Sequence, residues 1–309
     1  MIDPDIAGFV AESEAFYPNL AEPPPIDEQR RSYEAYARAF AVRRPAGVSS
    51  EDAALGCPDR TIPLRLYRPR QVSARGVVIY AHGGGFMLGS LDSHDGIVAR
   101  VADEVGVPVI AIDYRLAPEH NAEAALGDVM DVATALLDGR TLWPDLPRER
   151  LGLMGDSAGG TLACMAALRL GQVAKDRLHA LALIYPMLGF EPAEPARTRW
   201  AKAPMLTLDE IRFFRSIAFD ARDEMALALP LDEADIAGLP PTVLLPAQVD
   251  PLCDDCTVLA ERLKGTGTEA VLLPGTGLVH GALRALDRAP VMAVAFSRMC
   301  SQISAWLDA

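Results

Sequence analysis

Short apolar runs alternate with longer amphipathic stretches from about residue 76 to the end of the chain. The runs contain Val, Ile and Leu without polar alternation, which is typical of strands that are buried on both faces. Alternation of this kind predicts an α/β fold with a largely parallel sheet. The runs are GVVIYAHG (76–83), VPVIAIDYR (107–115), RLGLMGDS (150–157), ALALIYP (180–186), PTVLLPAQVD (241–250) and EAVLLPG (269–275).

Between these runs, apolar residues recur at helical spacing, and we predict helices there. One earlier stretch, TIPLRLYRPR (61–70), alternates apolar and polar residues and predicts an antiparallel strand at the edge of the sheet. The predicted fold is a central, mostly parallel sheet that is flanked by helices. The predicted helices span residues 122–137, 158–170, 256–263 and 291–307.

Two regions interrupt the alternation: residues 1–45, which contain the run Pro23–Pro25, and residues 187–235. The second contains MLTLDEIRFFRSIAF (205–219), which is apolar at helical spacing. Ligands of open α/β sheets bind at the carboxyl ends of the strands, so helices inserted after a strand are well placed to cover a site. We predict a single domain, residues 1–309, with a helical cap formed by both regions. The alternative is a set of peripheral helices that only pad the core.

The strongest local motif is Gly155-Asp156-Ser157-Ala158-Gly159. It ends an apolar run and opens a helical stretch, which is the strand–turn–helix setting of the GxSxG nucleophile elbow. A glycine turn without a catalytic role is the alternative interpretation. We predict that Ser157 is a nucleophile.

A nucleophilic serine needs a base, and the base needs a carboxylate that orients it. In this kind of fold the three residues follow one another as Ser, Asp or Glu, and His. Of the five histidines, only His179 and His280 follow Ser157. His179 precedes a predicted strand and would lie at the wrong end of the sheet, whereas His280 lies in a glycine-flanked loop after the last apolar run. We predict that His280 is the base.

The orienting acid is expected at the end of the preceding strand. PTVLLPAQVD ends in Asp250, and Pro251 stops the strand. The competing carboxylates, Asp254 and Asp255, are better explained as caps of the helix that is predicted to begin near Cys256.

A glycine loop follows the first parallel strand, with the sequence His82-Gly83-Gly84-Gly85-Phe86. A developing oxyanion needs N–H donors that are already aimed at it, and glycines let the backbone come that close. We predict donors at Gly83, Gly84 and Ala158. A phosphate loop is the alternative, but the Walker Lys-Ser/Thr pair is absent from the sequence.

The composition narrows the classes of partner. The formal net charge of -13 argues against nucleic acid and anionic membranes, which attract clustered Lys and Arg. The N-terminal segment has acids where a signal peptide needs positive charge, and no apolar run reaches the ~18 residues of a membrane span. We expect a cytoplasmic protein without a membrane partner.

The five cysteines are scattered along the sequence. Cys253 and Cys256 have CxxC spacing, but a zinc site would need further Cys or His ligands at workable spacing, and there is no second pair. We therefore interpret them as ordinary thiols and expect neither a metal nor an organic cofactor.

The motifs HGGGF (82–86), GDSAGG (155–160) and DPLCDD (250–255) and the loop histidine, in this order, resemble the hormone-sensitive-lipase-like esterases (bacterial family IV). The resemblance covers roughly residues 62–285 and points to the GDSAG branch of this family. It implies the α/β-hydrolase fold with a helical lid. It also implies the triad Ser157, Asp250 and His280, and the oxyanion donors Gly83, Gly84 and Ala158.

The resemblance implies a serine carboxylesterase that hydrolyses short-chain acyl esters of small molecules through an acyl-enzyme, and it allows a homodimer. An N-deacylase or an acetyl hydrolase is the alternative within the class. A non-catalytic ligand receptor of the same fold is a remote alternative, because such receptors have lost the histidine. Apolar residues expected to line the pocket, unless they belong to the core, are Phe86, Phe213, Phe214, Leu252 and Val279.

Overall fold

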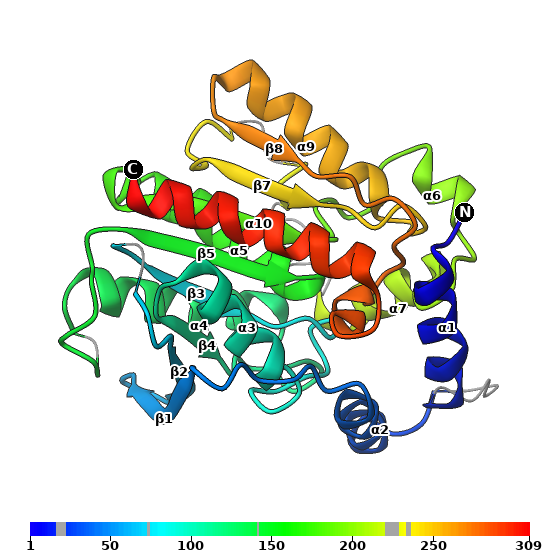
Figure 1. Cartoon of the computed structure of the whole chain (residues 1–309), viewed down its shortest axis with the longest axis horizontal. Helices are drawn as coiled ribbons and strands as arrows, with labels where there is room; N and C mark the ends of the chain where they lie inside the picture. The colour runs from blue at the N-terminus through cyan, green and yellow to red at the C-terminus, as the bar shows by residue number, and fades with distance from the viewer. Residues whose placement is uncertain (17–22, 73–74, 141, 220–228, 233–235) are drawn as a thin grey trace.

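The computed structural model describes residues 1–16, 23–72, 75–140, 142–219, 229–232 and 236–309. In this part of the chain, eight strands form one sheet in the order β1-β2-β4-β3-β5-β6-β7-β8 (Figure 1). The strands are β1 Ser49–Gly56, β2 Thr61–Arg68, β3 Val77–Ala81, β4 Val109–Ile112, β5 Leu151–Asp156, β6 Leu178–Ile184, β7 Thr242–Leu245 and β8 Ala270–Leu272.

The six strands from β3 to β8 are parallel, as the apolar runs predict. The stretch 61–70 does contain an antiparallel strand, β2, but its predicted place at the edge of the sheet is wrong. β2 pairs with β4 on one side and with β1 on the other, so that β1 forms the edge. The sequence of β1, SSEDAALG, is polar and mostly exposed, so it carries no strong strand signal.

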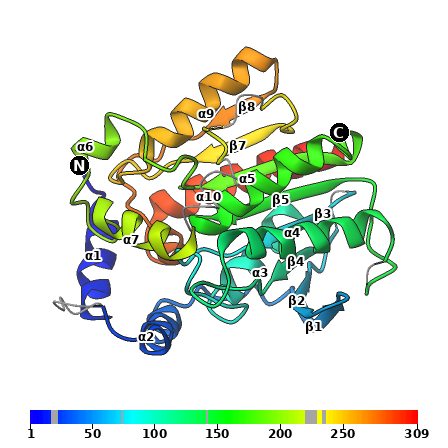
Figure 2. The same ribbon diagram turned by 180° about the vertical axis from the view of Figure 1, so that it is seen from behind.

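Helices cover both faces of the sheet (Figures 1 and 2). α3 and α10 pack on one face, and α4, α5 and α9 pack on the other, each group against its own apolar core. The helices are α1 Pro4–Ser13, α2 Ile26–Ala39, α3 Asp95–Val105, α4 Ala122–Leu137, α5 Ala158–Gly171, α6 Ala196–Arg199, α7 Leu208–Ala218, α9 Cys253–Thr266 and α10 Pro290–Asp308. The four helices predicted between the strands correspond to α4, α5, α9 and α10.

Strand β3 shows why the strands are apolar throughout. Ile79 and Ala81 belong to the core under α4, α5 and α9, whereas Val78 and Tyr80 belong to the core under α3 and α10. Successive side chains of a strand point to opposite faces, so a strand between two helical layers needs apolar residues at every position. Burial of each large aliphatic side chain contributes about 1.5–3 kcal/mol.

The segments that interrupt the βα alternation gather at one end of the molecule. α1, α2, α6 and α7 lie together there in both opposite views (Figures 1 and 2). Arg30 attaches α2 to the core, because its Nε donates to the carbonyl of Met87 at 3.0 Å and its two Nη atoms bind Glu119 at 2.8 and 2.7 Å. Residues 17–22, 220–228 and 233–235 of the predicted cap lie outside the described residues.

Asp254 and Asp255 do not act as predicted. α9 begins at Cys253, so both residues lie in its first turn, and no side chain caps its N-terminus. Instead, Asp255 accepts hydrogen bonds from the N–H groups of Leu188 and Ala193 at 2.9 and 2.7 Å. Asp254 accepts one from the N–H of Ala196 at 2.8 Å. The two carboxylates therefore hold residues 188–196, which lie in the second region of the predicted cap, against the core.

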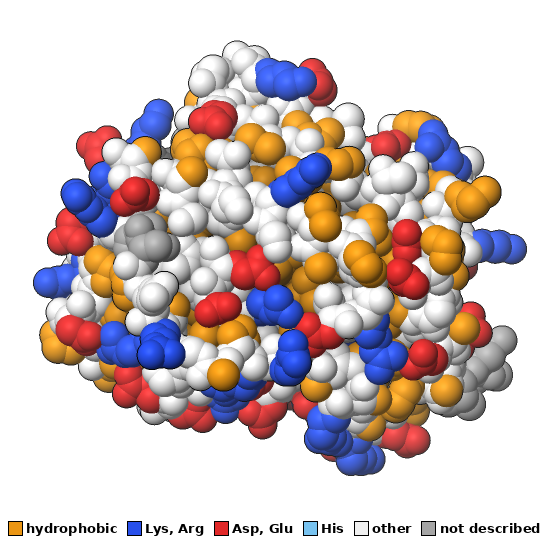
Figure 3. Space-filling view, viewed as in Figure 1, with side chains coloured by type: hydrophobic (Ala, Val, Ile, Leu, Met, Phe, Trp, Pro, Cys, Tyr) orange, Lys and Arg blue, Asp and Glu red, His pale blue; other side chains and the backbone are white. Residues whose placement is uncertain are grey.

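The face that carries α3 and α10 shows acidic and basic side chains close to one another (Figure 3). Ion pairs account for part of this arrangement. Arg100 of α3 binds Asp287 at 2.8 Å, and Arg288 binds Glu12 of α1 at 2.7 Å. On this face, the net negative charge of the chain is not gathered into one acidic area.

Candidate active site

Ser157 lies at the tip of a sharp turn between β5 and α5. Its backbone angles, φ 52° and ψ -122°, are unusual for a residue with a side chain. The turn is held by a hydrogen bond from the Ser157 N–H to the carbonyl of Ile184 at 2.9 Å. The chain passes so close to β3 that a Cβ atom on Gly159 would lie 2.1 Å from the carbonyl oxygen of Ala81. This close approach explains why the turn needs glycine two positions after the serine.

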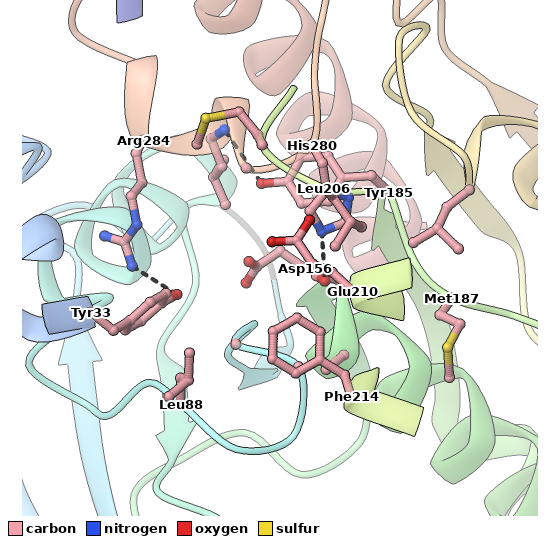
Figure 4. Close-up of a pocket in the computed structure, with 18 of the residues that line it drawn as sticks. Tyr33, Leu88, Asp156, Tyr185, Met187, Leu206, Glu210, Phe214, His280 and Arg284 are labelled. Carbon is pink, nitrogen blue, oxygen red and sulfur yellow. Dashed lines mark hydrogen bonds between the residues drawn. The ribbon is translucent and has the colours of Figure 1, made fainter. Parts of the chain in front are cut away.

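The structure brings Ser157, His280 and Asp250 together in one hydrogen-bonded chain. The Oγ atom of Ser157 lies 2.8 Å from Nε2 of His280. On the other side of the ring, Nδ1 lies 2.6 Å from Oδ2 of Asp250. The Asp250 side chain is fully buried, whereas the His280 side chain is 12% exposed and faces the pocket shown in Figure 4. With the proton on Nδ1, the ring presents a free electron pair to the serine hydroxyl.

A short backbone pairing aligns the acid with the base. Val249 forms a parallel bridge with Val279, and its N–H donates to the carbonyl of Leu278 at 3.0 Å. The residue after each bridge partner is the functional one, Asp250 or His280, so the two side chains start side by side. The second carboxylate oxygen of Asp250 accepts the N–H of Leu252 at 2.9 Å, which fixes the carboxylate.

Tyr185 braces the histidine loop from the end of β6. Its ring lies 4.7 Å from the His280 ring, centroid to centroid. Its hydroxyl oxygen accepts a hydrogen bond from the N–H of Leu283 at 3.3 Å. Tyr185 is itself held at a φ of 35°, a backbone position that is unusual for a large side chain.

The glycine loop after β3 differs from the prediction at its first glycine. The N–H of Gly83 donates to Oδ1 of Asp156 at 3.0 Å, so it is not free to bind a substrate oxygen. The prediction of Gly83 as an oxyanion donor is therefore wrong, because the buried carboxylate next to the nucleophile has already taken this N–H. In the described part of the chain, the N–H groups of Gly84 and Gly85 have no protein acceptor, and both residues line the pocket with Ala158.

The protonation states of the charged and titratable groups beneath the loop are set by their surroundings. Burial by itself would raise the pKa of Asp156, but the charge of His94, whose Nε2 lies 3.6 Å from the carboxylate, and the hydroxyl of Tyr80 outweigh it and lower the pKa to about 2. Tyr80 donates to Asp156 at 2.7 Å. Burial lowers the pKa of His82 to about 3, so this ring is neutral near pH 7. Its Nδ1 lies 2.9 Å from the carbonyl oxygen of Gly83, so the ring contacts the backbone of the loop.

Ser157 lines a cavity of about 280 Å³. Three of the predicted lining residues, Phe86, Phe214 and Leu252, do line it. Phe213 and Val279 are absent from the described lining, so these two predictions are wrong. Val279 is buried in the core behind the bridge to Val249, and Phe213 is partly buried in the core beside Phe214.

Several lining residues were not predicted from the sequence. They come from α2, from the glycine loop after β3, from the end of β6, from the segment around α7 and from the turn after the histidine, which are far apart along the chain. In the sequence, only the position of Arg284, four residues after His280, indicated that one of these residues could lie near the pocket. The main unpredicted lining residues are Tyr33, Tyr36, Leu88, Met187, Met205, Leu206, Ile211 and Arg284.

The cysteines and possible metal ligands lie apart from this chemistry. Cys253 and Cys256 are free thiols. Burial is the largest cause that raises the pKa of Cys253 to about 12, and the pKa of Cys256 is also raised. Among the residues that the structure describes, no three His, Cys, Asp or Glu side chains are grouped so that they could hold a metal ion. No described helix is long and apolar enough to cross a membrane.

Comparison with known proteins points to one family. Residues 78–284 match a family that is described by the α/β-hydrolase fold. An ethyl acetate hydrolase of Pseudomonas putida is 32% identical over 267 residues, which cover 84% of this chain and 83% of the relative. The carboxylesterase NlhH of Mycobacterium tuberculosis is 34% identical over 243 residues, or 77% of this chain and 76% of the relative.

A solved structure agrees with the sequence relatives. An esterase of Pyrobaculum calidifontis is 27% identical and superposes with a TM-score of 0.88, and the match covers 100% of both chains. The sheet, the serine turn and the hydrogen-bonded triad agree with this similarity. The chain belongs to the hormone-sensitive-lipase-like (bacterial family IV) esterases of the α/β-hydrolase superfamily.

Proposed function

We propose that the protein is a serine carboxylesterase that hydrolyses short-chain acyl esters through an acyl-enzyme. The observation that carries this proposal is the continuous chain of hydrogen bonds from Ser157 to His280 (2.8 Å) and from His280 to Asp250 (2.6 Å). A nucleophile, a base and an orienting carboxylate in this order are the groups that acyl transfer requires.

In the first half of the reaction, Ser157 Oγ attacks the ester carbonyl carbon while His280 Nε2 accepts the hydroxyl proton. The carbonyl oxygen becomes negatively charged and accepts hydrogen bonds from the N–H groups of Gly84, Gly85 and Ala158. When the intermediate collapses, the C–O bond to the alcohol breaks, and His280 returns the proton to the departing oxygen. Preorganised donors of this kind each contribute about 3 kcal/mol to the lowering of the barrier.

In the second half, a water molecule takes the place of the alcohol. His280 accepts a proton from this water as its oxygen attacks the acyl-enzyme carbonyl, and the same N–H groups bind the oxyanion. Collapse of the intermediate releases the carboxylic acid, and His280 gives the proton back to Ser157. Each bond change uses only the triad, the backbone donors and water, so the proposed reaction needs no cofactor.

The proposed preference for short acyl chains is supported by the size and lining of the cavity. About 280 Å³ is at the small end of ligand pockets. Met187, Leu206, Ile211, Phe214 and Leu252 supply apolar walls. A similar relative, named for ethyl acetate, supports the same choice.

We also propose that residues 1–45 and 187–235 form one cap over the site. Tyr33 and Tyr36 from the first region and Leu206 and Ile211 from the second line the same cavity, which supports a joint role. The cytoplasmic location, the homodimer and membership of the GDSAG branch stay predictions. Light scattering of the purified protein tests the homodimer.

The proposed function is tested with p-nitrophenyl esters of increasing acyl length and a matched anilide. We expect the highest kcat/KM between acetyl and hexanoyl esters, and slower hydrolysis of the anilide. Ser157→Ala should abolish turnover and labelling by a fluorophosphonate, while Ser301→Ala, which changes an exposed serine of α10, should change neither. Activity of Ser157→Ala within tenfold of the unmodified enzyme would refute the proposal.

A further inference from the structure

Arg284 is a buried cation in the wall of the active-site cavity. Its side chain lies in the short 3-10 turn Ala282–Ala285, directly after the histidine loop. The residue is only 6% exposed, yet it lines the same cavity as Ser157 and His280. No carboxylate of the described residues lies within 4.0 Å of its guanidinium group. A cation removed from water in this way gains most from an anion that approaches through the cavity.

The protein satisfies only part of the hydrogen-bonding capacity of Arg284, and it does so with neutral groups. One Nη atom donates to the carbonyl of Ser93 at 2.9 Å, and the other donates to the hydroxyl of Tyr33 at 3.1 Å. The rings of Tyr33 and Tyr36 lie 5.2 and 5.4 Å from the guanidinium carbon. A guanidinium has five N–H donors in a planar fork, so donors remain for a planar oxyanion.

Other charged groups lie near the cavity, but their hydrogen bonds are directed elsewhere. The carboxylate of Asp156 accepts from Tyr80 and Gly83 and lies 3.6 Å from Nε2 of His94, so its charge acts on Arg284 through space without a direct contact. Glu210 accepts from the hydroxyl and the N–H of Thr207, both at 2.7 Å, as part of the capping box of α7. The remaining lining carboxylate is the exposed Glu14.

The two ends of the cavity differ in character. Figure 4 shows Arg284 and Tyr33 on one side of Asp156 and His280, and Met187 and Phe214 on the other. A substrate whose ester group sits at the serine therefore meets a cationic, aromatic wall at one end and an apolar wall at the other. The asymmetry suits a short molecule with one polar end.

We propose that Arg284 is a specificity-determining residue that binds a carboxylate of the substrate, so that the enzyme acts on short esters that carry one free carboxylate. This inference rests on the proposed esterase function and names the substrate class for the same site. A carboxylate at Arg284 would form charge-assisted hydrogen bonds in a place from which water is largely excluded. Bonds of this kind correspond to an advantage of about 10- to 100-fold in kcat/KM.

The test compares charged and neutral esters of similar length in a pH-stat. Monoethyl succinate and ethyl pentanoate form the pair with the carboxylate on the acyl side, and 4-acetoxybutanoate and pentyl acetate form the pair with it on the alcohol side. The variants are Arg284→Met and Arg284→Lys. The matched control is Arg288→Met, because Arg288 also stacks on an N-terminal ring, that of Phe40 at 4.7 Å, but does not line the cavity.

We expect Arg284→Met to lower the charged-to-neutral ratio of kcat/KM by about 10- to 100-fold in at least one pair. Arg284→Lys should retain part of the ratio, and Arg288→Met should leave it unchanged. If Arg284→Met lowers the rates of both members equally or leaves the ratio unchanged, Arg284 has a structural role and the inference is wrong.

Wild-type rates give a second measurement that does not depend on the folding of a variant. Hydrolysis of at least one charged ester with a kcat/KM no lower than that of its neutral partner supports the inference. Lower values in both pairs overturn it. Failure of the proposed function itself would look different, because the wild-type enzyme would then leave the neutral esters unhydrolysed as well.

Discussion

The carboxylate of Asp156 is expected to hold the oxyanion loop, and Asp156→Asn tests this directly. The side chain is buried at the end of β5, with Oδ1 within 3.0 Å of the Gly83 N–H and 2.7 Å of the Tyr80 hydroxyl. Gly83 is followed by Gly84 and Gly85, which line the pocket and whose N–H groups have no acceptor among the described residues. Asparagine has nearly the same shape, so the substitution removes the charge while it leaves the volume almost unchanged.

The effect on stability can be worked from the lowered pKa of Asp156. A change from 3.8 in the unfolded chain to about 2 in the folded protein corresponds to roughly 2 kcal/mol of stability near pH 7. Because the folded pKa is the lower one, this stability is present above about pH 4 and is lost as the pH falls through about 2. Asp156→Asn should lack this contribution at pH 7, and its stability should change less between pH 4 and pH 2.

The effect on catalysis follows from the weaker hold on Gly83. Complete loss of one oxyanion donor costs about 3 kcal/mol of barrier, and a looser loop should cost part of that. We therefore expect a decrease in kcat of about tenfold, which corresponds to about 1.4 kcal/mol, with the triad still intact. The Ser157–His280 pair is unchanged, so labelling by a fluorophosphonate should persist at a reduced rate.

The assays are urea unfolding at pH 7 and steady-state hydrolysis of p-nitrophenyl acetate. Asp103→Asn, an exposed change on α3 that removes the same charge, is the control and should alter stability by less than about 0.5 kcal/mol. The reasoning is refuted if Asp156→Asn keeps kcat within threefold of the wild-type value and unfolds at the same urea concentration.

Three further predictions concern the triad, the loop and the cap. Asp250→Asn should lower kcat by about 10⁴-fold, because the imidazole loses the partner that fixes its tautomer; a decrease of less than tenfold in stopped-flow or steady-state rates contradicts this. Gly84→Ala should lower kcat by about 10²-fold or more, because φ is 133° and a Cβ would lie 2.2 Å from the carbonyl oxygen of Leu88; unchanged kinetics with a soluble protein would show that the loop adapts. Burial raises the pKa of Asp255 to about 7, so its contribution to stability is full below about pH 4 and is lost as the pH rises through 7. Asp255→Asn should remove this dependence of stability on pH. The prediction is contradicted if the urea midpoint of the variant changes between pH 5 and pH 8 as much as that of the wild type.

The parallel strands and the order of the triad could be read from the sequence because both are set by local signals. Uniform apolar runs mark strands between two helical layers, and the GxSxG turn requires glycine wherever the chain passes its neighbour closely. The geometry of parallel strands then places the ends of the strands before Ser157, Asp250 and His280 at one edge of the sheet. In the structure, two hydrogen bonds join these three side chains in a row.

Other features were decided only by the tertiary structure. The N–H of Gly83 is taken by a carboxylate 73 positions further along the chain, and nothing local distinguishes it from the N–H groups of Gly84 and Gly85. β1 forms the edge of the sheet through its pairing with β2, although its own sequence gives a weak strand signal.

The pocket wall shows the same limit. Tyr33 meets Arg284 across 251 positions of sequence, and the pattern of each segment by itself is equally consistent with an ordinary surface helix or turn. Hydrophobic periodicity records which face of an element is buried, but it does not record which partner buries that face. The sequence therefore determined the reacting groups and the sheet that carries them, whereas the packing of distant helices decided which donors are free and what surrounds the substrate.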